Sequence, residues 1–320
     1  MPFFPCSGQR LAALLLLFLV VPVATAESRF AFSEEQVSTQ WQALTGGMRD
    51  AFPSPAALRA EAERYPRLRD ETLRVLAERG DDPLLAGLEG DLSDRDFEII
   101  SEVVVKAWAA LFNGDFEKAH SLGRRVGPPG MFPALYARAL QAQYVEQDAA
   151  RRERMLREVM DETARLLQMQ PEHRFARFGH AYAKSRLLEP MGTLAAQRTG
   201  YMEDIQNILD DLLAADPDNL YALTLQGGVY AGIIDKAGRF LARRRFNVTP
   251  EMVDQVFERA LSLNPGFAAP YLEFALAMEK VWGSDRQSRI NAMLEKASAV
   301  TPVSAEEALV VDKARSRLND

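Results

Sequence analysis

The chain repeats a helical segment that ends in a proline followed by a turn, and this repeat restricts the folds open to it. Four segments close in this way: RLLQMQPEH, DLLAADPDN, RALSLNPGF and KASAVTPVS. Their prolines are Pro171, Pro217, Pro265 and Pro302, which by subtraction lie 46, 48 and 37 residues apart. Repeats of this length are typical of helix pairs that stack into an array. We therefore predict an all-α fold built as an irregular array of helical hairpins, an α-solenoid.

The first 26 residues have the layout of a secretory signal peptide. Arg10 precedes the apolar run Leu11 to Val21, and Ala24-Thr25-Ala26 is a small-residue cleavage site ahead of Glu27. An apolar run of 11 residues is too short to span a bilayer as a helix. We predict that residues 1–26 are removed; the alternative is an uncleaved membrane anchor.

Composition fits an exported protein that does not bind nucleic acid. The only cysteine, Cys6, lies in the predicted signal peptide, so the mature chain would hold no disulfide and no thiolate metal site. Loss of Arg10 lowers the basic count from 38 to 37 against 45 acidic residues, which argues against a nucleic-acid partner. Beyond residue 26 no apolar run approaches about 18 residues, so we expect no stable membrane insertion. These features predict a periplasmic protein, or a secreted one in a eukaryote.

The mature chain divides into an N-terminal helical cap, residues 27–92, and a repeat region, residues 93–320. Ser33-Glu34-Glu35-Gln36 is a capping box, and we expect the helix that it opens to run to Gly46. A second amphipathic helix follows, which Pro66 should kink or divide. Such a segment would cover the exposed apolar end of a stacked array.

One short motif links the repeat region to a known family. Asn113-Gly114-Asp115-Phe116-Glu117-Lys118-Ala119 combines a turn glycine, an aromatic residue that fills the gap between two helices, and a small alanine that lets them approach. In this motif the sequence resembles the tetratricopeptide repeat, at the turn between its two helices. The resemblance covers residues 93 to 302 and implies helix pairs that form a binding surface.

The later repeats supply the first-helix signature of the same family. We set each closing proline at the family's thirty-second position, which fixes where the next repeat's signature must fall. The signature positions are Tyr271, Phe274, Ala275 and Met278 after Pro265; Leu223, Gln226, Gly227 and Tyr230 after Pro217; and, with a slip of two residues, Phe175, Phe178, Gly179 and Tyr182 after Pro171. This register places Gly227 where the two helices of its repeat cross.

Two segments depart from the family's pattern, residues 187–200 and residues 233–249. They are extra relative to the family's repeat, so the helices of these units are either longer or joined by long connections. A regular groove along the array is therefore in doubt. The inserts either leave the groove open or cover it.

The resemblance implies a set of residues that would line a groove for a protein or peptide partner. If the family's groove positions carry over, the set is His173, Ala176, His180, Ala183 and Lys184; Tyr221, Thr224 and Gly228; and Leu272, Leu276, Glu279 and Lys280. We expect a non-enzymatic scaffold that binds another protein. The alternative is that these residues are structural or solvated.

A second hypothesis comes from the closing stretch, from FERALSLNPGF to KARSRLND. It resembles the exported, tetratricopeptide-like component associated with tripartite (TRAP-type) solute transporters, through an aromatic-rich helix, an Asp-Arg turn and a final Ala-Arg helix. That resemblance implies a pocket for a small hydrophobic solute. Aromatic side chains that could form it are Phe175, Phe178, Tyr182, Tyr221 and Tyr230. The same spacing also fits ordinary core packing.

No catalytic set or cofactor motif assembles in the sequence. His120, His173 and His180 show no metal-ligand spacing, although the last two could share a helix face; we read them as surface or groove residues and expect no metal or cofactor. Lys236, Arg239, Arg243, Arg244 and Arg245 form a dense basic cluster. It is either a contact for an anionic partner or, as we expect, a solvated helix end whose arginines complement the helix dipole.

Overall fold

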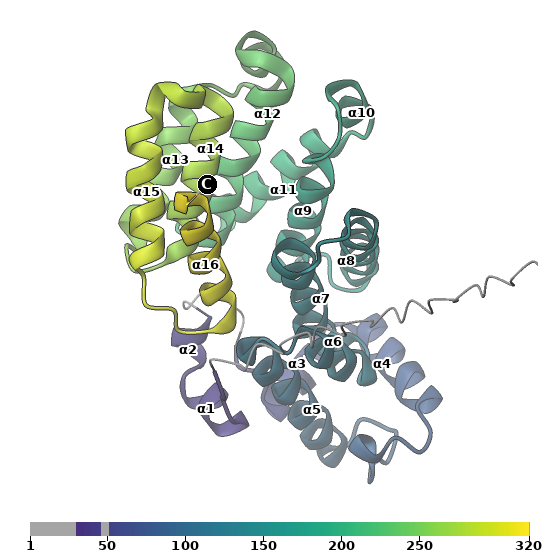
Figure 1. The fold of residues 1–320 in the computed structure, drawn as a ribbon. Helices are drawn as coiled ribbons and strands as arrows, with labels where there is room; N and C mark the ends of the chain where they lie inside the picture. Colours follow the sequence, from purple (N-terminus) through teal and green to yellow (C-terminus); the bar gives the residue numbers. More distant parts are fainter. Residues whose placement is uncertain (1–29, 46–50, 320) are drawn as a thin grey trace, which may run out of the picture.

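The computed structural model describes residues 30–45 and 51–319. The predicted signal peptide and its cleavage site lie outside the described residues. Within the described ranges the chain is all-helical, with no strand, as the sequence predicts (Figure 1). In the same ranges no helix is long and apolar enough to cross a membrane.

Successive helices pack as antiparallel neighbours along most of the chain. The long helices that form neighbouring pairs are α5 (Asp94–Asn113) with α6 (Phe116–Arg125), α7 (Met131–Leu140) with α8 (Ala149–Met169), α9 (Arg174–Leu188) with α11 (Tyr201–Ala215), α12 (Leu220–Phe246) with α13 (Pro250–Leu263), and α14 (Ala268–Trp282) with α15 (Gln287–Ala299). The last helix is α16 (Ala305–Asn319). Short turns occupy the connections: the 3₁₀ helices η1 (Pro83–Leu85), η2 (Pro128–Gly130) and η4 (Gly283–Arg286), and the π-helical turn η3 (Gln141–Val145).

The closing prolines stop the helices where the sequence predicts. Helices α8, α11, α13 and α15 end two or three residues before Pro171, Pro217, Pro265 and Pro302. The residue before proline avoids the helical region because the proline ring crowds its backbone. Before the first three prolines that residue is extended, with φ between −146° and −133°.

The N-terminal segment packs mainly against α5. It contains α1 (Glu34–Thr39), α2 (Trp41–Leu44), α3 (Pro55–Arg64) and α4 (Pro66–Glu78). The predicted capping box at Ser33 is present, and the chain divides at Pro66 as expected. The single helix expected from Ser33 to Gly46 is wrong, because Gln40 leaves the helical conformation and separates α1 from α2. Trp41 packs edge-on against Trp108 of α5, with ring centroids 5.3 Å apart.

The two inserts take different forms. Residues 187–200 hold the end of α9 and the short helix α10 (Thr193–Arg198) in the connection to α11. Residues 233–249 lengthen α12, which bends at Gly238, where φ is 77° and ψ is 154°. A residue with a side chain rarely adopts this backbone conformation, so glycine permits the bend.

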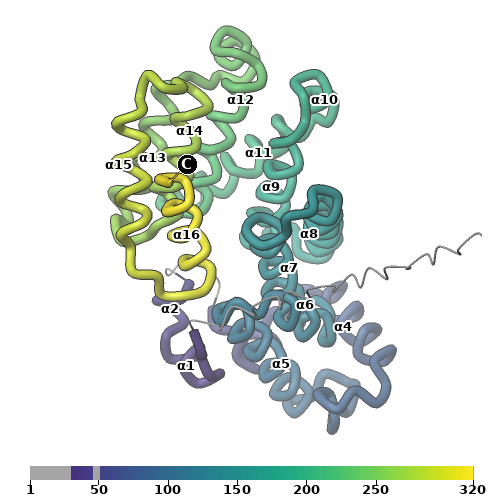
Figure 2. The backbone as a smooth tube through the Cα atoms, viewed as in Figure 1, coloured from purple at the N-terminus to yellow at the C-terminus, as the bar shows by residue number. Residues whose placement is uncertain are grey.

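Helix α16 brings the end of the array back to its beginning. It packs against α14 and α15 and also against α5 (Figure 2). Tyr136 of α7 donates a hydrogen bond from its hydroxyl to the Glu306 carboxylate of α16. The array therefore curves into a partly closed arc, with α16 between its two arms.

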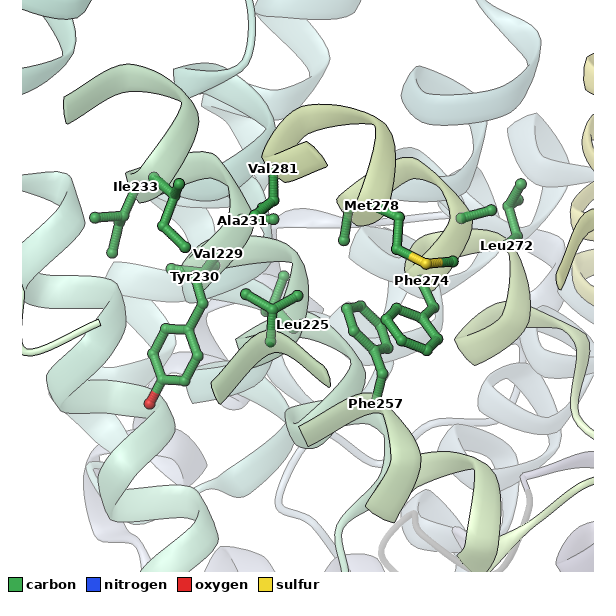
Figure 3. Close-up of a cluster of buried hydrophobic side chains, with 14 of the residues drawn as sticks. Leu225, Val229, Tyr230, Ala231, Ile233, Phe257, Leu272, Phe274, Met278 and Val281 are labelled. Carbon is green, nitrogen blue, oxygen red and sulfur yellow. The ribbon is translucent and has the colours of Figure 1, made fainter. Parts of the chain in front are cut away.

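The largest core cluster runs from α9 and α11 through the fourth and fifth helix pairs to α16, and Figure 3 shows its part in α12, α13 and α14. Phe257 of α13 stacks on Phe274 of α14 with ring centroids 4.8 Å apart. Gly227 of α12 lies directly against the Phe257 ring: a Cβ atom built on Gly227 would lie 2.5 Å from it. The predicted crossing at Gly227 is confirmed.

Candidate functional site

A cavity of about 410 Å³ lies inside the arc. Its wall is formed mainly by α7, α9, α12, α14 and α16, with further residues from η3, α8 and α11. Much of that wall is apolar, and its larger apolar members include Leu135, Phe175, Phe178, Tyr221, Ile233, Phe267 and Leu276. The volume falls in the range of small-molecule sites.

Three helices contribute to the cavity wall at the same distances from their preceding prolines. Four residues after Pro171, Pro217 and Pro265, by addition, come Phe175, Tyr221 and Ala269. Eleven residues after them come Tyr182, Gly228 and Leu276, and fifteen after them come Arg186, Gly232 and Lys280. All nine line the cavity. Helices α9, α12 and α14 therefore present equivalent faces to it.

Side-chain size differs strongly between these equivalent positions. Helix α9 places Tyr182 and Arg186 on the wall, where α12 has Gly228 and Gly232. A Cβ atom on Gly232 would meet nothing within 4 Å, and one on Gly228 would lie 3.8 Å from the Glu273 carboxylate. The glycines of α12 thus leave this part of the cavity empty, and Tyr182 and Arg186 of α9 supply the polar groups that face it.

The polar centre of the wall is a buried ion-pair cluster around Arg186. Its guanidinium donates to Glu273 of α14 at 2.6 Å and to Glu189 at 2.7 Å. The side chains of Arg186 and Glu273 are 9% and 14% exposed. Burial alone works to raise the pKa of Glu189, but the charges of Arg186, Lys280 and Lys236 outweigh it and lower that pKa. The Glu189 carboxylate therefore stays ionised at neutral pH.

Two tyrosines lie beside this cluster. Burial raises the pKa of Tyr144 and raises the pKa of Tyr182 to about 12, and the neighbouring Glu273 acts in the same direction. Their hydroxyls therefore keep their protons at neutral pH and can donate hydrogen bonds. No described residue forms a hydrogen bond with the Tyr144 hydroxyl, which leaves it free to bond a molecule in the cavity.

Most of the other charged groups of the wall are also engaged. Glu279 accepts two bonds of 2.7 Å from Arg317 of α16. The Lys280 ammonium lies 3.8 Å from Glu189. The Lys236 ammonium donates to the Glu189 and Met191 carbonyls at 3.1 Å and 2.7 Å. The cavity wall therefore combines apolar surface with charges that are largely neutralised by one another.

Several residues that the sequence nominated as groove residues or pocket aromatics lie on the cavity wall. They are Ala176, Tyr221, Thr224, Gly228, Leu276, Glu279 and Lys280, together with Phe175, Phe178 and Tyr182, and Lys236 of the basic cluster. The structure thus brings together most of the nominated residues of α12 and α14.

The nominated histidines of α9 lie away from the cavity. His173 caps the start of α9 by accepting from the Ala176 amide, and stacks on Phe132 with centroids 4.0 Å apart. His180 packs against α8, where its Nδ1 lies 3.0 Å from the Met160 carbonyl. Burial lowers the pKa of His180, and the charge of Lys184 adds to the effect.

Four other nominated residues are also structural. Lys184 pairs with Asp204 of α11 at 2.9 Å, and Ala183 is fully buried beside α8. Leu272 and Tyr230 belong to the core of Figure 3. Burial raises the pKa of Tyr230 to about 12, with a smaller contribution from Asp210.

The slip of two residues after Pro171 explains why α9 was read on the wrong face. It places Phe175, Phe178 and Tyr182 at the packing positions of the repeat, although the solute-binding hypothesis named the same aromatics as pocket residues. Without the slip, they fall on the same face as Tyr221 and Gly228 of α12, which is the cavity face. The register set by the proline would also have found Arg186, which the sequence analysis missed together with Glu189 and Glu273.

His173 lines a second hollow, between α3, α5 and the start of α9. Its volume of about 510 Å³ exceeds that of the cavity, but it is more open and less apolar. Arg64 and Glu172 at its edge form an exposed ion pair of 3.2 Å. We regard the cavity inside the arc as the better candidate because it is less open and more apolar than the second hollow.

The basic cluster lies at the end of α12. Arg239 donates to the Val281 carbonyl at 3.0 Å, and Arg245 pairs with Glu203 of α11 at 2.9 Å. Arg243 and Arg244 are exposed. They form no ion pair with a described residue.

No group of three or more metal-ligating side chains gathers among the residues that the structure describes. In comparisons with known proteins, no family model, no curated protein and no solved structure matches this chain.

Proposed function

We propose that this protein is an exported, non-enzymatic binding protein whose tetratricopeptide-like helix pairs hold a small, uncharged amphiphilic molecule. The observation that carries the proposal is the cavity, which has an apolar wall and a polar centre neutralised by its own ion pairs. Of the two hypotheses drawn from the sequence, the geometry favours the solute-binding one over the protein scaffold.

The position of α16 supports a small ligand rather than a peptide. In an open array a peptide would lie along the concave face formed by α9, α12 and α14. Here Glu306 and Val310 of α16 stand in that space and line the cavity. A peptide several residues long would have to displace α16 from α5 and α14, at the cost of their packing.

The charge balance supports an uncharged ligand. Arg186 is already held by two carboxylates, and Glu279 by Arg317. A charged ligand would have to lose its water and compete with these pairs for a counter-charge, which is costly in a largely apolar site. A hydroxyl, ester or amide oxygen could instead accept a bond from Tyr144. The aromatic and aliphatic wall would hold the apolar body of the ligand.

The same pairing supports a binding role over catalysis. General acid-base chemistry needs a group whose proton can move at the working pH. The acids Glu189, Glu273 and Glu279 each pair with a cation, the pKa of Glu189 is lowered, and burial raises the pKa of Tyr182 to about 12. These groups are suited to fixing a ligand in place.

Filling the cavity from Gly232 tests the proposal. Gly232→Phe would put a ring into the cavity, whereas Gly232→Ala adds one methyl group in open space. Both changes remove a helical glycine and should raise stability by about 0.5 to 1 kcal/mol before any strain. We expect the neutral probe Nile red to bind the wild-type and Gly232→Ala proteins with enhanced fluorescence, and the Gly232→Phe protein at least tenfold more weakly.

Two further measurements make the test specific. The anionic probe 1-anilinonaphthalene-8-sulfonate should bind the cavity more weakly than Nile red, because its sulfonate would have to compete with Glu273 and Glu189 for Arg186 and with backbone carbonyls for Lys236. Native mass spectrometry of protein purified from its own compartment should show a bound neutral molecule that is absent from Gly232→Phe. Equal Nile red binding by Gly232→Phe and Gly232→Ala, with both proteins folded, would place the probe elsewhere and overturn the proposal.

A further inference from the structure

Two apolar side chains stand out on the surface. Phe240 on the end of α12 is 74% exposed and Leu194 on α10 is 70% exposed, the highest values among the large hydrophobic residues of the described chain. Leu241 beside Phe240 is 47% exposed. Exposure of this kind, gathered at one place, marks an interaction site more often than scattered apolar residues do.

The two side chains belong to segments that project from the same end of the molecule. In Figure 1, α10 and the last turns of α12 both extend beyond the body of the arc. The Lys236 ammonium, which precedes the bend at Gly238, bonds the Met191 carbonyl at 2.7 Å, just before α10 begins. We call α10 together with residues 239–246 of α12 the tip.

The three exposed large apolar residues of the tip are each followed by an arginine four positions later. The pairs are Leu194 with Arg198, Phe240 with Arg244, and Leu241 with Arg245. Residues four apart lie on the same face of a helix. Each of these apolar side chains is therefore accompanied by a guanidinium on its own face.

The tip is basic in a protein that is acidic overall. Residues 236–250 contain five basic residues and no acidic one, whereas the whole chain has a formal net charge of −7. Asp235 and Glu251 flank this stretch, and Glu203 pairs with Arg245. Arg198, Arg243 and Arg244 are exposed and pair with no carboxylate among the described residues. Their charges are available to an outside partner.

We propose that the tip docks on an anionic lipid surface. Phe240, Leu241 and Leu194 would enter the interface below the phosphates, and the arginines would bond the phosphates while their stems cover apolar surface. A fluid bilayer can mould itself around two projecting segments. A folded acidic protein would fit the arginines but would need matching pockets for Phe240 and Leu194.

The location of the tip connects it with the cavity. Lys236 lines the cavity and lies four residues before Phe240. Docking through the tip would therefore hold this edge of the cavity close to the lipid, where an apolar molecule could pass between bilayer and protein. The docking itself is independent of what the cavity binds.

Vesicle co-sedimentation tests the proposal. Vesicles of phosphatidylglycerol and phosphatidylcholine should retain the full mature protein, pure phosphatidylcholine vesicles should not, and 0.5 M salt should weaken binding. Arg243→Gln/Arg244→Gln should weaken it about 30-fold, since each arginine near the surface contributes roughly a fivefold factor. Phe240→Ser/Leu194→Ser should weaken it by at least tenfold.

Matched variants elsewhere on the surface serve as controls. Arg67→Gln/Arg154→Gln removes two exposed arginines that form no ion pair with a described residue, and Val303→Ser/Leu263→Ser removes two exposed apolar side chains. Neither should change binding by more than about twofold. Melting temperatures of all four variants should confirm that they are folded.

Three results would overturn the proposal: equal retention by neutral and anionic vesicles, equal losses in the tip and control variants, or no retention by any vesicle. Polyglutamate, added as a soluble polyanion, identifies the alternative. If the protein ignores vesicles but binds polyglutamate through Arg243 and Arg244, the tip is a site for an acidic protein and not for lipid.

Discussion

Helices α9 and α12 occupy equivalent places in successive pairs, yet α9 faces the cavity with large side chains and α12 faces it with glycines. At eleven and fifteen residues after the closing proline, α9 carries Tyr182 and Arg186, and α12 carries Gly228 and Gly232. The first helix projects side chains into the arc, and the second leaves room for them. The cavity is thus a consequence of unequal residues at equal positions, and a more uniform repeat would fill it or widen it into a groove.

The comparison also shows that residue type is a poor guide to the face of a helix. The aromatics of α9 resemble packing residues but line the cavity, whereas His180 and Ala181 pack inward. On α12 the small Gly227 receives the Phe257 ring on one side, and its neighbour Gly228 faces the cavity on the other. What distinguishes the faces is the distance from the closing proline.

The largest loss of stability is expected at Arg186 of α9, which lies fifteen residues after Pro171. Arg186→Met removes the cation from Glu273 and Glu189 and leaves Glu273 buried without its guanidinium. Breaking a buried ion pair from one side costs about 3 to 5 kcal/mol, so we expect a loss of this size in urea-unfolding free energy. A substitution at the equivalent position of α12, Gly232→Ala, should cause no loss of unfolding free energy.

A second variant separates charge from packing. Arg186→Met/Glu273→Gln removes both members of the pair, so it should recover at least about 1 kcal/mol relative to Arg186→Met alone. If the single variant loses less than about 1 kcal/mol, the cluster is better hydrated than its burial indicates. The case for an uncharged ligand would then weaken.

An intermediate effect is expected from two adjacent glycines of α12. Gly227→Leu must displace the Phe257 ring, and overpacking of this kind costs about 1 to 3 kcal/mol or more. Gly228→Leu extends into the cavity, so its stability should be unchanged or slightly raised. Thermal and urea unfolding of the two variants provide the comparison. Similar losses at both positions would contradict the assignment of faces.

The all-α fold and its helix ends could be predicted from the sequence because they depend on local chemistry. Proline excludes the residue before it from the helix, and Ser33 caps α1 through its own neighbours. The break at Gln40 was missed because nothing in its residue type requires it. The bend at Gly238 was also missed, since a single glycine is tolerated inside a helix.

The candidate site was only partly predictable because two of its determinants are not local. The Arg186 and Glu273 partners lie 87 residues apart and meet only after three helix pairs have stacked. Glu306 and Val310 reach the cavity because α16 returns to α5, and no pattern within α16 indicates that return. Counting from the closing prolines predicts which residues of α9, α12 and α14 face the cavity. It does not predict that α16 packs against α5 and closes one side of the cavity.

The smallest effect concerns the inward face of α9 and depends on pH. His180 has its pKa lowered in the folded protein, mainly by burial and then by Lys184, so the unfolded chain binds the extra proton more readily. The contribution of His180 to the free energy of unfolding should therefore be fully present above the unfolded pKa of about 6.5. It should fall as pH decreases toward the folded value, with a slope of at most about 1.4 kcal/mol per pH unit.

The variant His180→Gln tests this expectation, because it keeps a side chain that can donate to the Met160 carbonyl but cannot titrate. We expect urea-unfolding free energies of this variant to lose that slope between pH 6.5 and 5, while Glu279→Gln, on the cavity face of α14, should keep it. An unchanged slope in His180→Gln would mean that His180 takes up its proton equally well in both states, and hence that this face of α9 is open to water.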